Sequence, residues 1–168
     1  KCVIISQHSD TAGPATACEE TSSDVPVFNV SYNQSMFDVA PTTYLTGCKI
    51  KWKPYMKAAV DAVLNGKVVE KNIRGNIHGN DVGAGFDEGW VSMLEFNDIV
   101  VADGTKEMVA DVIEQFKKDR LTVFKGDYIG VNTDNPNDII DLSEGFVENK
   151  DSSAPSFNYI LKDIITIE

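Results

Sequence analysis

The feature that most constrains the fold is an alternation of short β-branched runs with helical patterns. The apolar runs are VIIS, PVFNVSY, YLTGCKI, GWVSMLEF and LTVFKG, and turn-forming residues bound each of them. Helical patterns lie between them, in residues 11–21, 53–67 and 105–120. Strands that alternate with helices predict an α/β fold, with a mostly parallel sheet in a three-layer, helix-sheet-helix arrangement.

The second helical pattern is the clearest, because Met56, Val60 and Val63 recur at helical spacing between Pro54 and the stop signal Gly66. The third has the same design, and we expect its apolar side chains to face inward: Met108, Val109, Val112, Ile113 and Phe116. Beyond residue 126, Asn, Asp, Ser and Pro predict loops and turns, and residues 158–168 predict a short helix or strand.

Composition excludes several classes of protein. The formal net charge of −11 argues against a general nucleic-acid binder, because phosphate affinity needs clustered Lys and Arg. Three cysteines without a CxxC pair argue against a zinc ribbon, and we expect free thiols, with a Cys2–Cys18 disulfide as the alternative. No apolar run is long enough to span a bilayer. The chain starts at Lys1 on strand-like sequence, so we expect that the natural N-terminus lies upstream.

A cluster of polar residues ends the first predicted strand. Gln7, His8 and Asp10 follow VIIS, at the edge of a parallel sheet where ligands commonly bind. Their donors and acceptors suit a polar small molecule or a ribose. The alternative is that Ser9 or Asp10 caps the helix that follows.

The second predicted strand ends in a similar way, in Ser31, Tyr32 and Asn33. If the two strands are parallel neighbours, both clusters emerge at the same edge of the sheet. Asn33 is therefore a candidate ligand-binding residue, with loop chemistry as the alternative.

The sequence offers little support for catalysis. The sequence contains no GxSxG motif, and its two histidines, His8 and His78, lack the spacing of metal ligands. We therefore expect no cofactor, no metal and no enzyme activity. Residues 72–90 are rich in glycine but contain no phosphate-binding loop, and we expect an exposed hairpin or crossover loop over 76–81. An α/β enzyme with His8 and Asp10 as acid-base groups is the alternative.

An ordered series of motifs resembles the C-terminal half of the basic membrane protein family of ABC-transporter substrate-binding lipoproteins. The family's QHTDSP-type branch has a strand ending in QHxD with a nearby Pro, a segment like SDMSxFAPxxxLT, and a W-x-PYY helix ending VLDGxW. The matching residues are Gln7, His8, Asp10, Pro14, Ser35, Phe37, Ala40, Pro41, Leu45, Thr46, Trp52, Pro54, Tyr55, Val63, Leu64 and Gly66.

The resemblance implies a type I periplasmic-binding fold, in which two α/β lobes close on a ligand. Residues 1–47 and 84–168 would form the second lobe, and 48–83 would be a crossover strand, helix and loop of the first. Relatives bind purine nucleosides, adenine or similar small molecules, without catalysis, and pass them to a membrane permease. The implied ligand-binding residues are Gln7, His8, Asp10 and Asn33, with Phe86 and Asp87 from GFDEG.

The chain departs from the family at three places. Asn33 stands where many relatives have an acidic residue for ribose hydroxyls, and Asp87 stands where relatives often have a lysine. Because of these two departures, the resemblance alone does not imply that this chain is specific for nucleosides. The first half of the family's length, with its signal and lipobox cysteine, is absent, although the family location would be extracytoplasmic, as a cell-envelope lipoprotein.

Without a first lobe, the helix of residues 53–67 would expose an apolar face. We therefore expect it either to repack locally or to be covered by a second copy in a swapped homodimer. We expect Trp52 and Trp90 to pack in a core or hinge, because each lies in or beside a strand-like run. A sensory or regulatory ligand-binding domain of the same fold is a further alternative to the transporter.

Overall fold

The computed structural model describes residues 2–21, 25–73, 76–78, 81–146 and 157–162. The chain divides into two compact units. Unit 1 comprises Lys1–Arg74 and Ala84–Glu114, and unit 2 comprises Gly75–Gly83 and Gln115–Glu168. This division differs from the lobes that the family resemblance implies, because residues 48–74 cluster with the N-terminal strands; the assignment of lobes stays a prediction.

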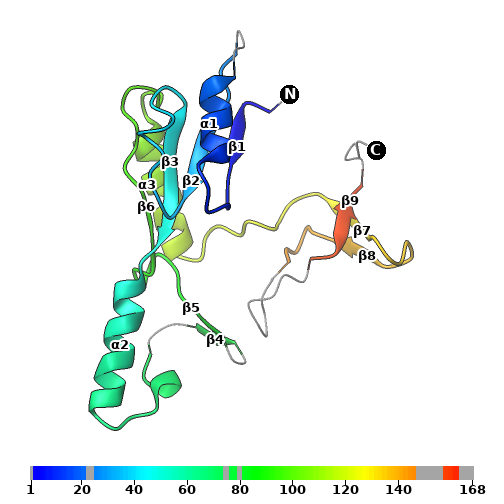
Figure 1. Ribbon diagram of the computed structural model, residues 1–168. Helices are drawn as coiled ribbons and strands as arrows, with labels where there is room; N and C mark the ends of the chain where they lie inside the picture. The colour runs from blue at the N-terminus through cyan, green and yellow to red at the C-terminus, as the bar shows by residue number, and fades with distance from the viewer. Residues whose placement is uncertain (1, 22–24, 74–75, 79–80, 147–156, 163–168) are drawn as a thin grey trace. The chain divides into compact units, whose positions relative to one another are not determined.

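Unit 1 is built on a four-stranded sheet with the strand order β1-β2-β3-β6 (Figure 1). The strands are β1 (Ile4–Ser6), β2 (Phe28–Tyr32), β3 (Tyr44–Ile50) and β6 (Val91–Met93). The first three are parallel, and β6 runs antiparallel to β3. The predicted α/β class with a mostly parallel sheet is therefore confirmed for this unit.

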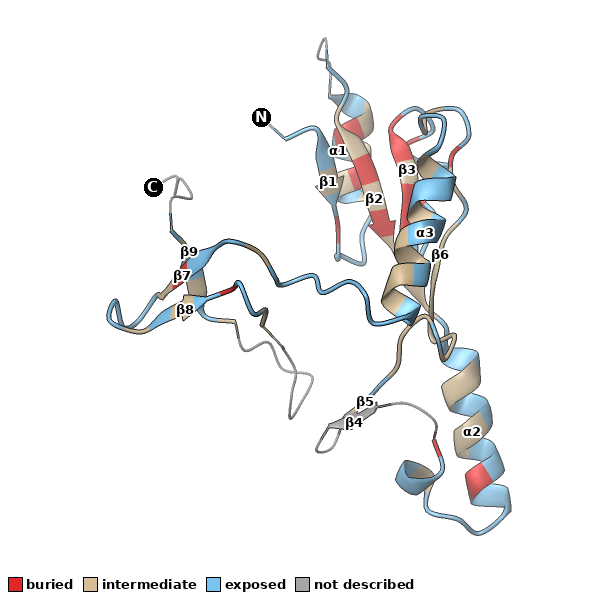
Figure 2. Cartoon of the chain, turned by 180° about the vertical axis from the view of Figure 1, so that it is seen from behind, coloured by how far each residue is buried: buried red, intermediate tan, exposed pale blue. Residues whose placement is uncertain are grey.

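Two helices accompany this sheet, on opposite faces (Figures 1 and 2). Helix α1 (Gly13–Glu20), with Pro14 in its first turn, buries Ala15 and Cys18. Ala15 joins Met36, Ala40 and Tyr44 in the hydrophobic core. Helix α3 (Thr105–Lys117) keeps several apolar side chains half-buried, but Met108 is 71% exposed, so its predicted inward position is wrong.

A carboxylate ties the end of α1 to the start of β3. The oxygens of Glu19 accept hydrogen bonds from the hydroxyls of Thr42 (2.7 Å) and Thr43 (2.6 Å). Partial desolvation raises the pKa of Glu19, but the hydrogen bonds from Thr43 and Thr42 outweigh it, and the net pKa is lowered. The contact sets where α1 ends against the sheet.

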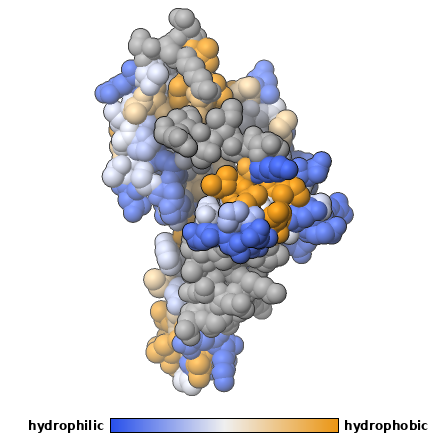
Figure 3. All heavy atoms as spheres, turned by 90° about the vertical axis from the view of Figure 1, so that its right-hand side faces the viewer, coloured by the Kyte–Doolittle hydropathy of each residue, from blue (hydrophilic) through white to orange (hydrophobic). Residues whose placement is uncertain are grey.

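Helix α2 (Trp52–Leu64) keeps its apolar face exposed, and of its residues only Ala62 is buried (Figure 2). Met56 is 55% exposed and Val63 65%. In Figure 1, α2 ends at the bottom of the view. At the bottom of Figure 3, hydrophobic residues (orange) lie on the surface beside hydrophilic ones (blue). The expected local repacking does not occur, and cover by a second copy stays a prediction. Trp52 is exposed, so its predicted place in a core is wrong.

The described strands of unit 2 are all short and antiparallel. Strands β4 (Asn76–His78) and β5 (Asp81–Gly83) pair as an antiparallel hairpin, one of the two forms expected for that segment. Strands β7 (Ile129–Asn132), β8 (Ile139–Asp141) and β9 (Tyr159–Leu161) form a second sheet in the order β8-β7-β9. The strand predicted for residues 121–126 is wrong, because that segment contains bends and no ladder.

Candidate functional site

The carboxyl ends of β1 and β2 meet at one edge of the sheet, as the sequence predicted. Ser6 lies opposite Val30 in the parallel register. His8 and Tyr32 come two residues after Ser6 and Val30, respectively. Their rings stack, with centroids 4.3 Å apart and an interplanar angle of 28°. His8 is exposed and Tyr32 is half-buried, so the imidazole forms the outer part of the stack. A planar ligand could extend such a stack.

Gln7 directly precedes His8 in the chain and, unlike His8, is buried. Its Oε1 accepts a hydrogen bond of 2.9 Å from Nδ2 of Asn29 on β2. Its Nε2 donates to the carbonyl oxygens of Ser9 and Thr11, at 3.3 and 3.1 Å. The amide therefore holds the loop that carries His8 and Asp10, and positions these residues from inside the protein.

We expect Gln7→Leu to lower the free energy of unfolding by about 1–3 kcal/mol, because Asn29 would lose its buried acceptor. Chemical denaturation of the wild type and the variant measures the difference. Gln34→Leu, the same change at an exposed position beyond β2, is the matched control and should cost much less. Equal costs for the two variants would show that the buried amide has no structural role.

Asn33 closes the end of β2. Its backbone has a φ of 61°, a left-handed conformation that Asn tolerates better than most residues. Its N–H donates to the carbonyl of Cys48 (2.7 Å), and its Oδ1 accepts from the N–H of Ile50 (2.9 Å). Part of the side chain predicted to bind ligand therefore holds the end of β3.

Asp10 is exposed in the loop before α1. The alternative role for Ser9 or Asp10, as a helix cap, is wrong: the N-cap of α1 is Ala12, and no side chain caps it. His8, Ser9 and Asp10 are thus the exposed polar residues that follow the first strand at this edge.

Phe86 and Asp87 lie elsewhere in unit 1, in a turn that precedes β6. The carbonyl of Phe86 accepts from Gly89, and that of Gly85 accepts from Trp90, at 3.2 and 3.1 Å. Glu88 Oε2 accepts from the N–H of Gly85, also at 3.1 Å. The turn is therefore closed by its own hydrogen bonds.

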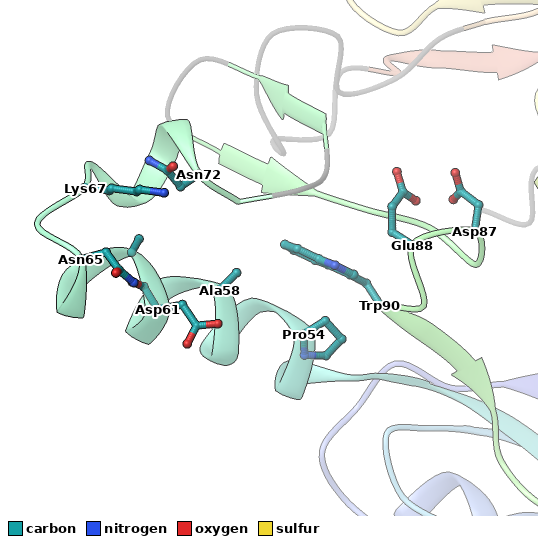
Figure 4. Close-up of a pocket in the computed structure, with 10 residues that line it drawn as sticks. Pro54, Ala58, Asp61, Asn65, Lys67, Asn72, Asp87, Glu88 and Trp90 are labelled. Carbon is teal, nitrogen blue, oxygen red and sulfur yellow. The ribbon is translucent and has the colours of Figure 1, made fainter.

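This turn forms one wall of a cleft with a volume of about 540 Å³, whose other wall is α2 (Figure 4). Asp87, Glu88 and Trp90 line it on one side, and Pro54, Ala58 and Ala62 line it on the other. Figure 4 shows the indole of Trp90 reaching into the space beside α2. Of the predicted site residues, Asp87 is the one that lines this cleft.

Trp90 is held at both its backbone and its ring. Its carbonyl accepts from the N–H of Lys51 at 2.6 Å. Its ring meets Tyr55 edge to face, with centroids 5.8 Å apart. The indole is therefore oriented by the start of α2. Trp90 is half-buried, whereas Trp52 is exposed, and a hinge role for Trp90 stays a prediction.

Other site chemistry is limited in the part of the chain that the structure describes. No group of three His, Cys, Asp or Glu side chains there could hold a metal ion. The three cysteines are free thiols, and burial raises the pKa of Cys18. None of the described helices is long and apolar enough to cross a bilayer.

Comparison with known proteins found no match, either to a protein-family model or to a curated protein. The family resemblance accordingly rests on the ordered motifs alone.

Sequence reasoning passed over Glu88 and treated Trp90 as packing. The signal for both was the acid pair Asp87-Glu88, which one glycine separates from Trp90 in GFDEGW. These residues line a cleft because α2 lies beside their turn, and the sequence did not predict that neighbour.

Proposed function

We propose that this chain is the C-terminal portion of the solute-binding component of an ABC importer, and that it binds a small, planar, polar molecule without converting it. The observation that carries the binding role is the stack of His8 on Tyr32 at the shared carboxyl edge of β1 and β2. Parallel sheets commonly bind ligands at that edge, because neighbouring strands aim side chains at one place.

The importer role is supported by the ordered motifs that resemble the basic membrane protein family. On this proposal the fold is of the type I periplasmic-binding class, the location is extracytoplasmic, and a membrane permease receives the ligand. The ligand class is nucleosides, nucleobases and related planar solutes. His8 stacks on the ring, and Asp10 and the amide of Asn33 offer hydrogen bonds to polar edges.

A thermal-shift screen tests this proposal. Nucleosides, free bases and riboflavin are added at high concentration to the full chain, because binding to the folded state raises the melting midpoint even when affinity is weak. For any ligand that shifts the midpoint, we expect His8→Ala to weaken binding by about fivefold to tenfold, the size of a lost aromatic stack.

His78→Ala is the matched control, because it makes the same change in the β4–β5 hairpin of unit 2 and should leave binding unchanged. Equal affinity of both variants would overturn the placement of the site. Chemical conversion of a ligand during incubation would contradict binding without catalysis and favour the enzyme alternative.

A further inference from the structure

The cleft between α2 and the turn before β6 has opposite charges at its two ends. Asp87 and Glu88 lie side by side at one end, and Lys67 lies at the other (Figure 4). The indole of Trp90 lies between them. A site of this kind matches a molecule with a positive group, an apolar middle and a negative group.

The wall formed by α2 leaves room for such a molecule. Ala58 and Ala62 recur at helical spacing after Pro54 on the side of α2 that faces the cleft. The large apolar side chains, Met56 and Val60, are exposed and do not line the cleft. Small side chains on this face keep the space beside Trp90 open.

The lysine end is shaped by hydrogen bonds to backbone carbonyls. The Lys67 N–H donates to the carbonyl of Ala62 (2.8 Å). The side-chain amides of Asn65 and Asn72 donate hydrogen bonds to the carbonyls of Asp61 and Val68, both at 2.6 Å.

The charge of Lys67 is available to a ligand. Within the described residues Lys67 forms no ion pair, whereas the nearby Asp61 is paired with Lys57 at 2.7 Å. The Lys67 ammonium is thus the positive group that this end offers to a ligand.

We propose that this cleft binds a small zwitterion whose ammonium and carboxylate groups are separated by an apolar chain. The carboxylate lies at Lys67, the apolar chain lies on the indole of Trp90, and the ammonium lies at Glu88 and Asp87. Charge-assisted contacts at both ends select such a molecule over one that has a single charge. This site goes beyond the proposed function, because it is separate from the stack of His8 and Tyr32 and does not depend on an importer role.

The test uses 6-aminohexanoate as the probe, with hexanoate and hexylamine as ligands that each lack one charge. In a Trp52→Phe background Trp90 is the sole tryptophan, so its fluorescence reports the cleft. We expect saturable binding of 6-aminohexanoate, and binding about tenfold weaker for each singly charged ligand, the loss typical of one charged hydrogen bond. Isothermal titration calorimetry gives an independent affinity.

Variants assign the two ends. Lys67→Met should bring the affinity for 6-aminohexanoate down to that for hexylamine. Glu88→Gln should lower the affinity towards that for hexanoate without reaching it, because Asp87 remains at the acidic end. Lys71→Met removes an exposed lysine that does not line the cleft, and should leave the affinity unchanged. Far-UV circular dichroism checks that each variant is folded.

Three outcomes would overturn the proposal, and the first two need no variant. One is the absence of saturable binding of both 6-aminohexanoate and its shorter homologue 4-aminobutyrate. Another is equal binding of hexanoate, hexylamine and 6-aminohexanoate, which would show an apolar cleft without charge selection. The third is an equal effect of Lys67→Met and Lys71→Met.

Discussion

Gly47→Ala is expected to destabilise unit 1 by at least about 2 kcal/mol, because a methyl group has no room at this position. A Cβ on Gly47 would lie 2.5 Å from the carbonyl oxygen of Ser31 and 2.9 Å from Cδ1 of Leu94, and would also meet the hydroxyl of Ser31. The clash with Ser31 is with backbone, in the strand paired directly with β3. Relief therefore requires β2 and β3 to move apart.

Thermal unfolding measures this effect, and we expect a midpoint about 10 °C lower. Gly83→Ala is the matched control, since it is also in a strand, has no heavy atom within 4 Å of its added Cβ and should change the midpoint little. A Gly47→Ala variant as stable as Gly83→Ala would show that the spacing between β2 and β3 is not as tight as described.

Tyr44→Ala should cost about 3–5 kcal/mol, the usual loss when a buried aromatic residue is truncated. Tyr44 is 1% exposed and packs with Ala15, Met36 and Ala40. These partners are small or flexible, and none can fill the space that the ring leaves. A loss of this size is a large part of the stability of an ordinary domain, so the variant is expected to be partly unfolded.

Tyr44→Phe separates the ring from its hydroxyl. The hydroxyl donates to the carbonyl of Glu95 at 3.4 Å, which is long for an O–H donor, so its loss should cost less than about 1 kcal/mol. Circular dichroism in denaturant compares the two variants with the wild type. If Phe were as harmful as Ala, the hydrogen bond and not the packing of the ring would be the source of stability.

The local elements of unit 1 were largely predictable from the sequence. Periodicity located the helices of residues 13–20, 52–64 and 105–117 and the strands β1, β2, β3 and β6. The edge of the sheet was also predictable, because parallel neighbours must bring QHSD and SYN to one side. The stack of His8 on Tyr32 follows from that register.

The roles of individual polar side chains were not predictable. Gln7 and Asn33 were expected to bind ligand, yet the side-chain oxygen of each accepts a hydrogen bond from another residue of the protein. A motif identifies polar residues at the end of a strand. It does not say which of their atoms face inward, because that depends on distances to Asn29 and Ile50 across the sheet.

The sequence by itself determined the α/β pattern and the place where polar side chains leave the sheet, because helical and strand periods are local properties of the chain. Only the tertiary structure decided that the segment 121–126 is not a strand, that the apolar face of α2 is exposed, and that α2 and Trp90 enclose a cleft. A strand needs a hydrogen-bonded neighbour, and burial and cavities need surfaces from distant parts of the chain. Those are properties of which segments meet, and no local pattern encodes them.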